Sequence, residues 1–246
     1  GMEWGKDVVL QDKYLYYEAF PEGTIVYDLE RGKMAGINKL PWQTDTSLGK
    51  NSWGYVTNWE SKEANTVVDD LIDIVSKNGC VLLNVGPKSD GTIPADQAET
   101  LLEIGDWLAV NGEAIYDTRC WKVFGEGPTE SEEGYMSEQK KQDKFQAEDI
   151  RFTTKNGKLY AIALDWPSNG QLEIKSLGKK DEHCQWEAKS VRMLGNDGSL
   201  QWSQSDESLT IELPKEKPND YAYTFEIDFG AFGEEATKNY ISIKSE

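Results

Sequence analysis

A short apolar run between two turn signals constrains the fold more than any other feature of this chain. Residues 80–83 are Cys-Val-Leu-Leu, preceded by Asn78-Gly79 and followed by Gly86-Pro87. Because four residues are too few for a core helix, the run predicts a short strand buried on both faces, with Cys80 acting as a small hydrophobic residue. Helical patterns precede and follow it. This alternation is typical of a parallel α/β sheet or barrel.

The remaining N-terminal elements fit the same rhythm. The helix before the run is expected over residues 66–77, capped by Asn65 and ended by Gly79. The helix after it is expected to begin at Pro94. Its expected buried stripe is Ala98, Leu101, Leu102, Gly105 and Leu108. Strands are expected at residues 8–10, 24–27, 42–47 and 80–84. In such folds the functional side chains lie at the carboxyl ends of the strands.

The pattern changes after residue 124. Residues 125–149 are polar and rich in Glu, Lys and Gln, which predicts a linker. Beyond it, short apolar runs alternate with Asn-Gly and Asp-Gly turns, which are hairpin signals and predict an antiparallel β-sandwich. The expected organisation is therefore an α/β domain over 1–124, a linker over 125–149 and a β-sandwich over 150–246. The sandwich strands are expected at 150–154, 159–164, 171–174, 190–194, 209–213 and 221–227.

Composition narrows the classes of partner. The net charge of −18 argues against nucleic acid and anionic membranes, and is typical of a secreted or periplasmic protein. The three cysteines are scattered and His183 is the single histidine, so a metal site is not expected. No apolar run approaches the length of a membrane span. There is no signal peptide, but Gly1-Met2 looks like a tag remnant before an initiator methionine, so nothing follows from that.

Five blocks of sequence together resemble one family. They are residues 27–32 (YDLERG), 41–47 (PWQTDTS), 51–55 (NSWGY), 75–94 (VSKNG through the apolar run to Pro94) and 111–116 (NGEAIY). In this order they resemble the α-L-fucosidases. The resemblance implies a TIM-like (β/α)8 catalytic barrel followed by a β domain. The chain is then expected to hold the second half of the barrel, a partial barrel, with the β-sandwich after it.

The resemblance also implies an activity and its residues. The intact enzyme would hydrolyse terminal α-L-fucosyl linkages of glycans with retention, without metal or other cofactor. Retaining enzymes use two carboxyl groups about 5–5.5 Å apart. The family nucleophile lies on a strand before this sequence begins, so it is expected to be absent and the chain inactive alone. Glu30 is the candidate general acid/base, with Asp28, Asp45 and Glu18 as competitors.

Further residues are candidates for substrate binding. Lys13 corresponds to a basic substrate-binding position that is often Arg in the family. Trp42 and Trp53 are candidates for an apolar platform under fucose, and Gln43 and Asp45 for hydrogen bonds to its hydroxyls. Asn84 is a candidate for ordering the pocket floor. Core packing of the two tryptophans and turn formation by the three polar residues stay open as alternatives.

Two other functions stay open. Four strands do not close a barrel, so a second copy or another partner chain is expected to cover the open edges. An oligomerising interaction protein is one alternative, and a non-catalytic carbohydrate-binding remnant is the other. The tryptophans of the β half, Trp166, Trp186 and Trp202, are expected in its core rather than at a sugar site.

Overall fold

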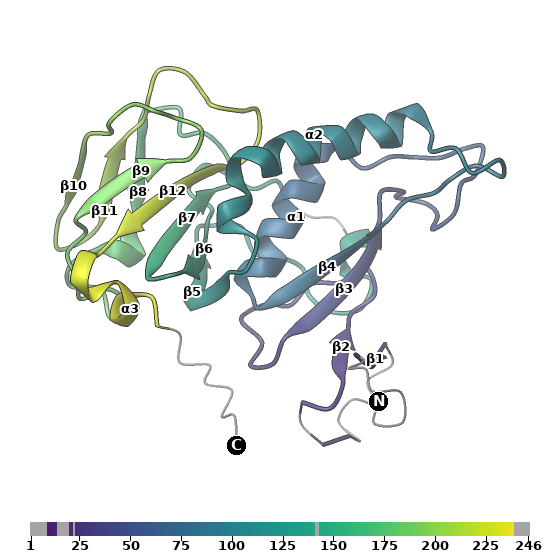
Figure 1. Cartoon of the computed structure of the whole chain (residues 1–246), viewed down its shortest axis with the longest axis horizontal. Helices are drawn as coiled ribbons and strands as arrows, with labels where there is room; N and C mark the ends of the chain where they lie inside the picture. The colour runs from purple at the N-terminus through teal and green to yellow at the C-terminus, as the bar shows by residue number, and fades with distance from the viewer. Residues whose placement is uncertain (1–8, 14–19, 22, 141–142, 239–246) are drawn as a thin grey trace.

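The computed structural model describes residues 9–13, 20, 21, 23–140 and 143–238. An α/β half and a β half lie side by side, with helices α1 and α2 on the side of the first sheet that faces the second half (Figure 1). Within these residues, no helix is both long and apolar enough to pass through a membrane.

The α/β half contains a four-stranded sheet. Its strands are all parallel and stand in chain order. They are β1 (Gln11–Asp12), β2 (Val26–Asp28), β3 (Trp42–Ser47) and β4 (Gly79–Asn84). The strands expected at 24–27, 42–47 and 80–84 are confirmed within two residues. The first is shifted, because Val9 and Leu10 precede β1 and are exposed, while Val8 lies outside the described residues.

Helix α1 (Ala64–Ser76) buries apolar residues, including Val67, Val68 and Ile72, in a core that it shares with α2 and the β half. Both of its predicted ends are wrong. Glu63 is the N-cap, and the Asn65 amide donates to Asp69 within the helix instead. Asn78 takes the left-handed turn with φ of 69°, which leaves Gly79 free to begin β4.

Helix α2 (Ala95–Asn111) follows Pro94 as expected, but its buried stripe differs. Ile104 and Trp107 are buried, and the Trp107 indole donates to the Ala222 carbonyl at 2.8 Å. Leu102 is 70% exposed, because it lies off the face that packs toward the β half. Of the expected stripe, Leu101 and Leu108 contact the core, while Gly105 is exposed.

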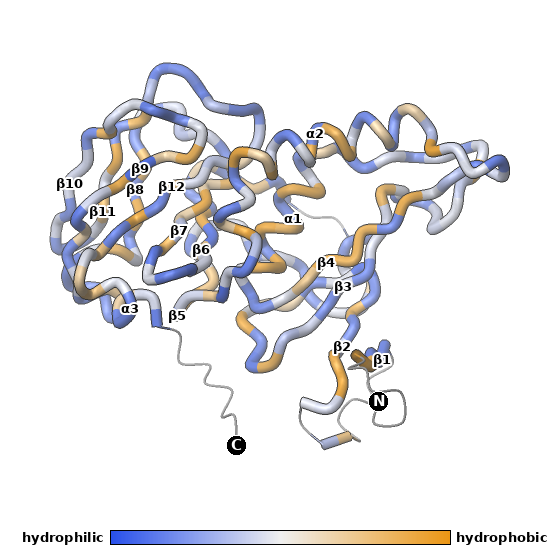
Figure 2. Tube along the Cα trace, viewed as in Figure 1, coloured by the Kyte–Doolittle hydropathy of each residue, from blue (hydrophilic) through white to orange (hydrophobic). Residues whose placement is uncertain are grey.

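Strand β4 is not buried on both faces, contrary to the expectation. Val81 and Leu83 pack toward the helix side, whereas Cys80 is exposed and Leu82 is 54% exposed. The helices cover one face of the sheet, and the described residues leave the other open at β4. Residues 80–83 of the strand are nevertheless all apolar, and most of β4 is orange in Figure 2.

The β half consists of two antiparallel sheets around a shared core. The five-stranded sheet has the order β5 (Arg119–Glu126), β6 (Ile150–Lys155), β7 (Lys158–Ala163), β12 (Tyr223–Asp228), β9 (Ser190–Met193). The three-stranded sheet has the order β10 (Trp202–Gln204), β11 (Leu209–Glu212), β8 (Gln171–Ile174). Short helices complete the fold: η2 (Gly112–Ala114), η3 (Ser137–Gln139), η4 (Lys175–Leu177), η5 (Gly230–Phe232) and α3 (Gly233–Ala236).

The central strands of the five-stranded sheet join the two halves. Phe152 and Ala161 face the core shared with the smaller sheet, while Tyr160 and Ile162 face the cluster that contains α1 and α2. The sheet begins at Arg119, earlier than the expected start at 150. The segment expected to be a linker also returns to the α/β half, where Gly134 pairs with Lys33.

Candidate functional site

Polar side chains gather where the four parallel strands end. Lys13 follows β1, Asp28 ends β2 and Glu30 comes two residues later, while Asp45 lies in β3 and Asn84 ends β4. The carboxyl ends of parallel strands meet at one edge of a sheet, which is where α/β barrels place their sites. The structure thus brings together the strand-end residues that the sequence singled out.

Lys13 links two of the carboxylates. Its Nζ atom lies 3.7 Å from Glu30 Oε2 and forms a hydrogen-bonded ion pair with Asp45 Oδ2. Burial alone would lower the pKa of Lys13, but the hydrogen bond to Asp45 and the charges of Asp45 and Glu30 raise it. The ammonium therefore stays charged and keeps both carboxylates near one point.

Buried carboxylate oxygens at this edge have no hydrogen-bond partner among the described residues, among them Asp28 Oδ1 and Asp45 Oδ1. Burial, followed by the neighbouring charge of Asp45, raises the pKa of Asp28 above its ordinary value. Gln43 stands in register with Asp28 and accepts a hydrogen bond from Gln11 at 2.7 Å. Unpaired buried acceptors are unusual, and a ligand rich in hydroxyl groups would satisfy them.

Trp53 and Asn84 belong to the same site. The Trp53 ring is 36% exposed and lies with its centroid 5.8 Å from Lys13 Nζ. The Asn84 amide donates to the Trp53 carbonyl at 2.6 Å and to Ser47 Oγ at 3.2 Å. Asn84 therefore orders the loop that carries Trp53.

The prediction of Trp42 as a sugar platform is wrong. Its side chain is 1% exposed and packs with Ile74 of α1, on the opposite face of β3 from Gln43 and Asp45. Its indole N–H donates to the Lys77 carbonyl at 3.0 Å. Side chains alternate between the faces of a strand, so adjacent residues of the β3 block cannot both line one pocket.

The sequence did not predict the charged side chains that support the site. Arg31 and Lys62 both bind Glu138, which comes from the segment expected to be a linker. Glu138 is one of four glutamates between residues 130 and 138, so nothing in the sequence distinguishes it. The remaining competitor for the acid/base role, Glu18, lies outside the described residues.

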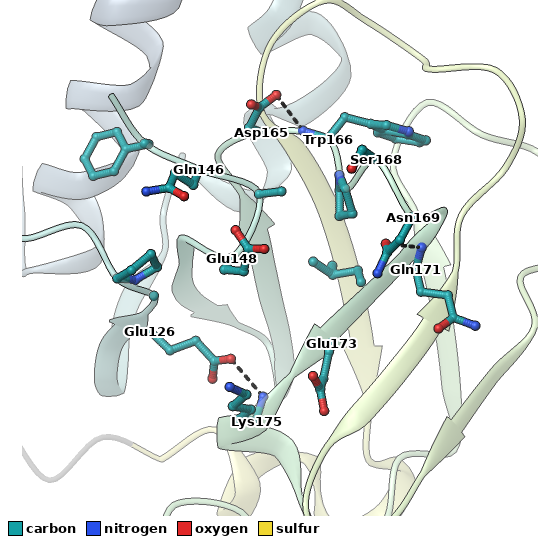
Figure 3. Close-up of a pocket in the computed structure, with 16 residues that line it drawn as sticks. Glu126, Gln146, Glu148, Asp165, Trp166, Ser168, Asn169, Gln171, Glu173 and Lys175 are labelled. Carbon is teal, nitrogen blue, oxygen red and sulfur yellow. Dashed lines mark hydrogen bonds between the residues drawn. The ribbon is translucent and has the colours of Figure 1, made fainter. Parts of the chain in front are cut away.

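A separate hollow of about 780 Å³ lies in the β half (Figure 3). Three side chains that line it accept hydrogen bonds from nearby backbone N–H groups: Glu126 from Lys175, Asn169 from Gln171 and Asp165 from Trp166. Trp166 packs edge-on against Tyr223 at 4.6 Å. Trp166, Trp186 and Trp202 all pack against the β core, which confirms the core prediction for these residues.

Both halves of the chain match models of known protein families. A family model described as Alpha-L-fucosidase matches residues 3–113, and one described as Alpha-L-fucosidase C-terminal domain matches residues 142–228. The tissue alpha-L-fucosidase of Homo sapiens is 34% identical over 229 residues, covering 90% of this chain and 44% of that protein. The plasma alpha-L-fucosidase of Rattus norvegicus is 34% identical over 184 residues, covering 71% of this chain and 34% of that protein.

A solved structure gives the same result. The Thermotoga maritima alpha-fucosidase in complex with a mechanism-based inhibitor superposes with a TM-score of 0.67 at 27% identity. The match covers 89% of this chain and 45% of that chain. The chain thus spans less than half the length of these relatives. Two family models that follow one another along the chain, similar sequences and a matching fold agree, and this chain belongs to the α-L-fucosidase family.

Proposed function

We propose that this chain is the C-terminal portion of an α-L-fucosidase that hydrolyses terminal α-L-fucosyl linkages with retention. We infer that its four parallel strands form the second half of a TIM-like barrel. The strands are parallel and in chain order, and helices cover one face. The 45% share of the Thermotoga structure that the match covers supports this reading.

The convergence of Lys13, Glu30 and Asp45 beside the exposed ring of Trp53 carries the proposal. Fucose is an uncharged sugar with an apolar methyl group and several hydroxyl groups. An aromatic ring binds the apolar part, and carboxylates and amides accept or donate to the hydroxyls. Trp53 is the proposed platform, and Lys13, Gln43, Asp45 and Asn84 are the proposed polar contacts.

Glu30 is the proposed general acid/base, because its side chain is partly exposed at the strand ends whereas Asp28 is buried. In the first step a carboxylate attacks the anomeric carbon while Glu30 gives its proton to the departing oxygen. In the second step Glu30 takes a proton from the water that releases fucose. We place the attacking carboxylate in a part of the enzyme outside these 246 residues. The mechanism uses no metal or organic cofactor.

We further propose that the intact protein works outside the cytoplasm, as a secreted or periplasmic enzyme. A relative at 34% identity is named as a plasma protein, and the net charge of −18 suits solubility in such a setting.

Fucose binding tests the function. We expect calorimetry to detect binding of fucose to the purified chain, and Trp53→Ala to weaken it about fivefold, because loss of one aromatic contact removes about 1 kcal/mol. The matched control is Tyr116→Ala, which removes an exposed aromatic ring from a different part of the surface. Its affinity for fucose should equal that of the wild type.

Absence of fucose binding would contradict the proposed site. The same sample should release no nitrophenol from nitrophenyl α-L-fucoside, since the attacking carboxylate is not in this chain. Release that Glu30→Gln abolishes would show that the chain is active alone, contrary to the proposal. Fucose binding without release of nitrophenol would also fit a non-catalytic carbohydrate-binding remnant. Hydrolysis of the fucoside by a full-length protein that contains this chain would exclude that interpretation.

We also propose that a second copy of the chain covers the open side of the sheet. Among the described residues, β1 and β4 each pair with a single strand, and Leu82 of β4 is largely exposed. Unpaired edges beside exposed apolar residues favour association. Light scattering at micromolar concentration should give twice the 27.8 kDa chain mass, and Leu82→Lys should shift the protein toward monomer. A monomeric wild type would contradict this arrangement.

A further inference from the structure

The loop that carries Glu30 is held by a segment far along the chain. The Met136 N–H donates to the Glu30 carbonyl at 3.0 Å, and the Glu138 N–H donates to the Arg31 carbonyl at 3.0 Å. The Gly134 N–H donates to the Lys33 carbonyl at 2.9 Å. Residues 134–138, here called the clamp, therefore bind the backbone of three residues in the loop after β2.

The clamp and the loop approach each other closely. A Cβ atom on Gly32 would lie 2.4 Å from the Gly134 carbonyl oxygen, so only glycine fits there. Arg31 and Met136 both have positive φ angles, of 44° and 56°. Non-glycine residues keep such angles where surrounding contacts impose them, and such strain is concentrated at functional sites.

Glu138, the last residue of the clamp, uses both carboxylate oxygens to bind residues of the α/β half. Oε1 accepts from Arg31 Nη1 at 2.5 Å, and Oε2 accepts from Lys62 Nζ at 2.8 Å and from Thr46 Oγ1 at 2.6 Å. The side chain is 10% exposed. Burial alone would raise the pKa of Glu138, but the charge of Lys62 and the three hydrogen bonds outweigh it and lower that pKa.

Arg31 connects Glu138 to the aromatic platform. Its Nη2 atom donates to the Gly49 carbonyl at 3.0 Å, and its guanidinium carbon lies 4.4 Å from the centroid of the Trp53 ring. A guanidinium held at this distance from an indole ring restricts the orientation of the ring. One face of Trp53 is thus occupied by Arg31, and the exposed remainder is available to a ligand.

We propose that Glu138 is a positioning residue for this site. It fixes the guanidinium of Arg31, which in turn fixes the ring of Trp53, while its backbone N–H holds the loop of Glu30. The identity of the ligand as fucose rests on the proposed function, but the relay from Glu138 to Trp53 is independent of it. A segment of the β half is thereby part of a site built on the α/β half.

The relay is measurable by ¹⁹F NMR of the full chain labelled with 5-fluorotryptophan. The chain has nine tryptophans, and Trp53→Phe identifies the resonance of Trp53. Glu138→Gln keeps the size of the side chain but removes its charge, and we expect it to shift or broaden the Trp53 resonance selectively. The control Glu132→Gln, which breaks an exposed ion pair with Lys140 nearby, should leave Trp53 unchanged.

An unchanged Trp53 resonance in Glu138→Gln would overturn the proposal. Arg31→Lys provides the second test, since it removes the planar group at Trp53 and leaves Glu138 in place. It should shift the Trp53 resonance by itself, and it serves alone if Glu138→Gln does not fold. On an Arg31→Lys background, Glu138→Gln should add little; an equal shift on both backgrounds would show that the effect does not pass through Arg31.

Fucose added to the wild type separates the relay from the proposed function. We expect the Trp53 resonance to move on titration with fucose, and Glu138→Gln to raise the fucose dissociation constant several-fold. A Trp53 resonance that responds to Glu138→Gln but not to fucose would contradict the fucose site and leave the relay supported. A Trp53 resonance that responds to fucose but not to Glu138→Gln would contradict the relay alone.

Discussion

Replacing Asp73 by Asn is expected to lower the free energy of unfolding by about 3–5 kcal/mol, because it leaves two buried cations without their counter-charge. Asp73 of α1 is 0% exposed. Its Oδ1 atom accepts from Arg151 Nε and its Oδ2 atom from Lys77 Nζ, both at 2.7 Å. Arg151 belongs to β6, so the ion pair joins the helix of one half to the sheet of the other.

The sign of the pH dependence follows from the same contacts. Burial alone would raise the pKa of Asp73, but the charges of Lys77 and Arg151 outweigh it and lower that pKa below the unfolded value of 3.8. The stabilisation is therefore present above about pH 4 and is lost as the pH falls through the folded pKa. Urea unfolding at pH 7 and at pH 3 should show a large difference between wild type and Asp73→Asn at pH 7 and a smaller one at pH 3.

The matched control is Glu187→Gln, which removes an exposed carboxylate that pairs with Lys179 and Lys189. Exposed pairs contribute little to stability, so urea unfolding should not distinguish this variant from the wild type. A loss of less than about 1 kcal/mol in Asp73→Asn would show that the buried charges relax or are hydrated, against this account.

Replacing Asp69 by Asn, one turn earlier in the same helix, is expected to have the opposite effect and to stabilise the protein at alkaline pH. Asp69 is buried, and its Oδ1 atom has no hydrogen-bond partner among the described residues. Burial, followed by the neighbouring charge of Asp70, raises the pKa of Asp69 from 3.8 to about 8. The fold therefore favours the protonated side chain, which Asn resembles in shape and charge.

The direction of the pH effect at Asp69 is the reverse of that at Asp73. A folded pKa above the unfolded value gives stabilisation that is fully present below about pH 4 and is lost as the pH rises toward 8. The loss is on the order of 5 kcal/mol at most. Thermal unfolding at pH 4, 7 and 9 should show similar midpoints for Asp69→Asn and wild type at pH 4, and a higher midpoint for the variant at pH 9.

Asp106→Asn, at an exposed position of α2, is the control for the change from Asp to Asn. It should leave the pH dependence of the unfolding midpoint unchanged. If Asp69→Asn unfolds at a lower temperature than the wild type at pH 9, the ionised carboxylate must have a stabilising contact, which would contradict destabilisation by its burial.

The residues at the strand ends show how much of the candidate site could be predicted from the sequence. The boundaries of β3 and β4 follow from local signals, and the parallel order follows from the alternation of strands and helices. Together they predict that Glu30 and Asn84 lie at one edge of a sheet, and the structure places both there. Pattern alone did not separate Trp42 from Gln43, since either face of β3 was a candidate for the pocket.

By itself the sequence determined most of the elements, the order of the parallel strands and the family, but it did not predict β5 or β10. These depend on residue types within short windows and on the general rule that parallel strands share an edge. Only the tertiary structure decided which face of the sheet is covered by helices, and hence that Trp42 is buried and Leu82 is exposed. It also decided that Glu138 supports Arg31, because a contact between residues so far apart in the chain depends on the packing of the two halves and leaves no local pattern.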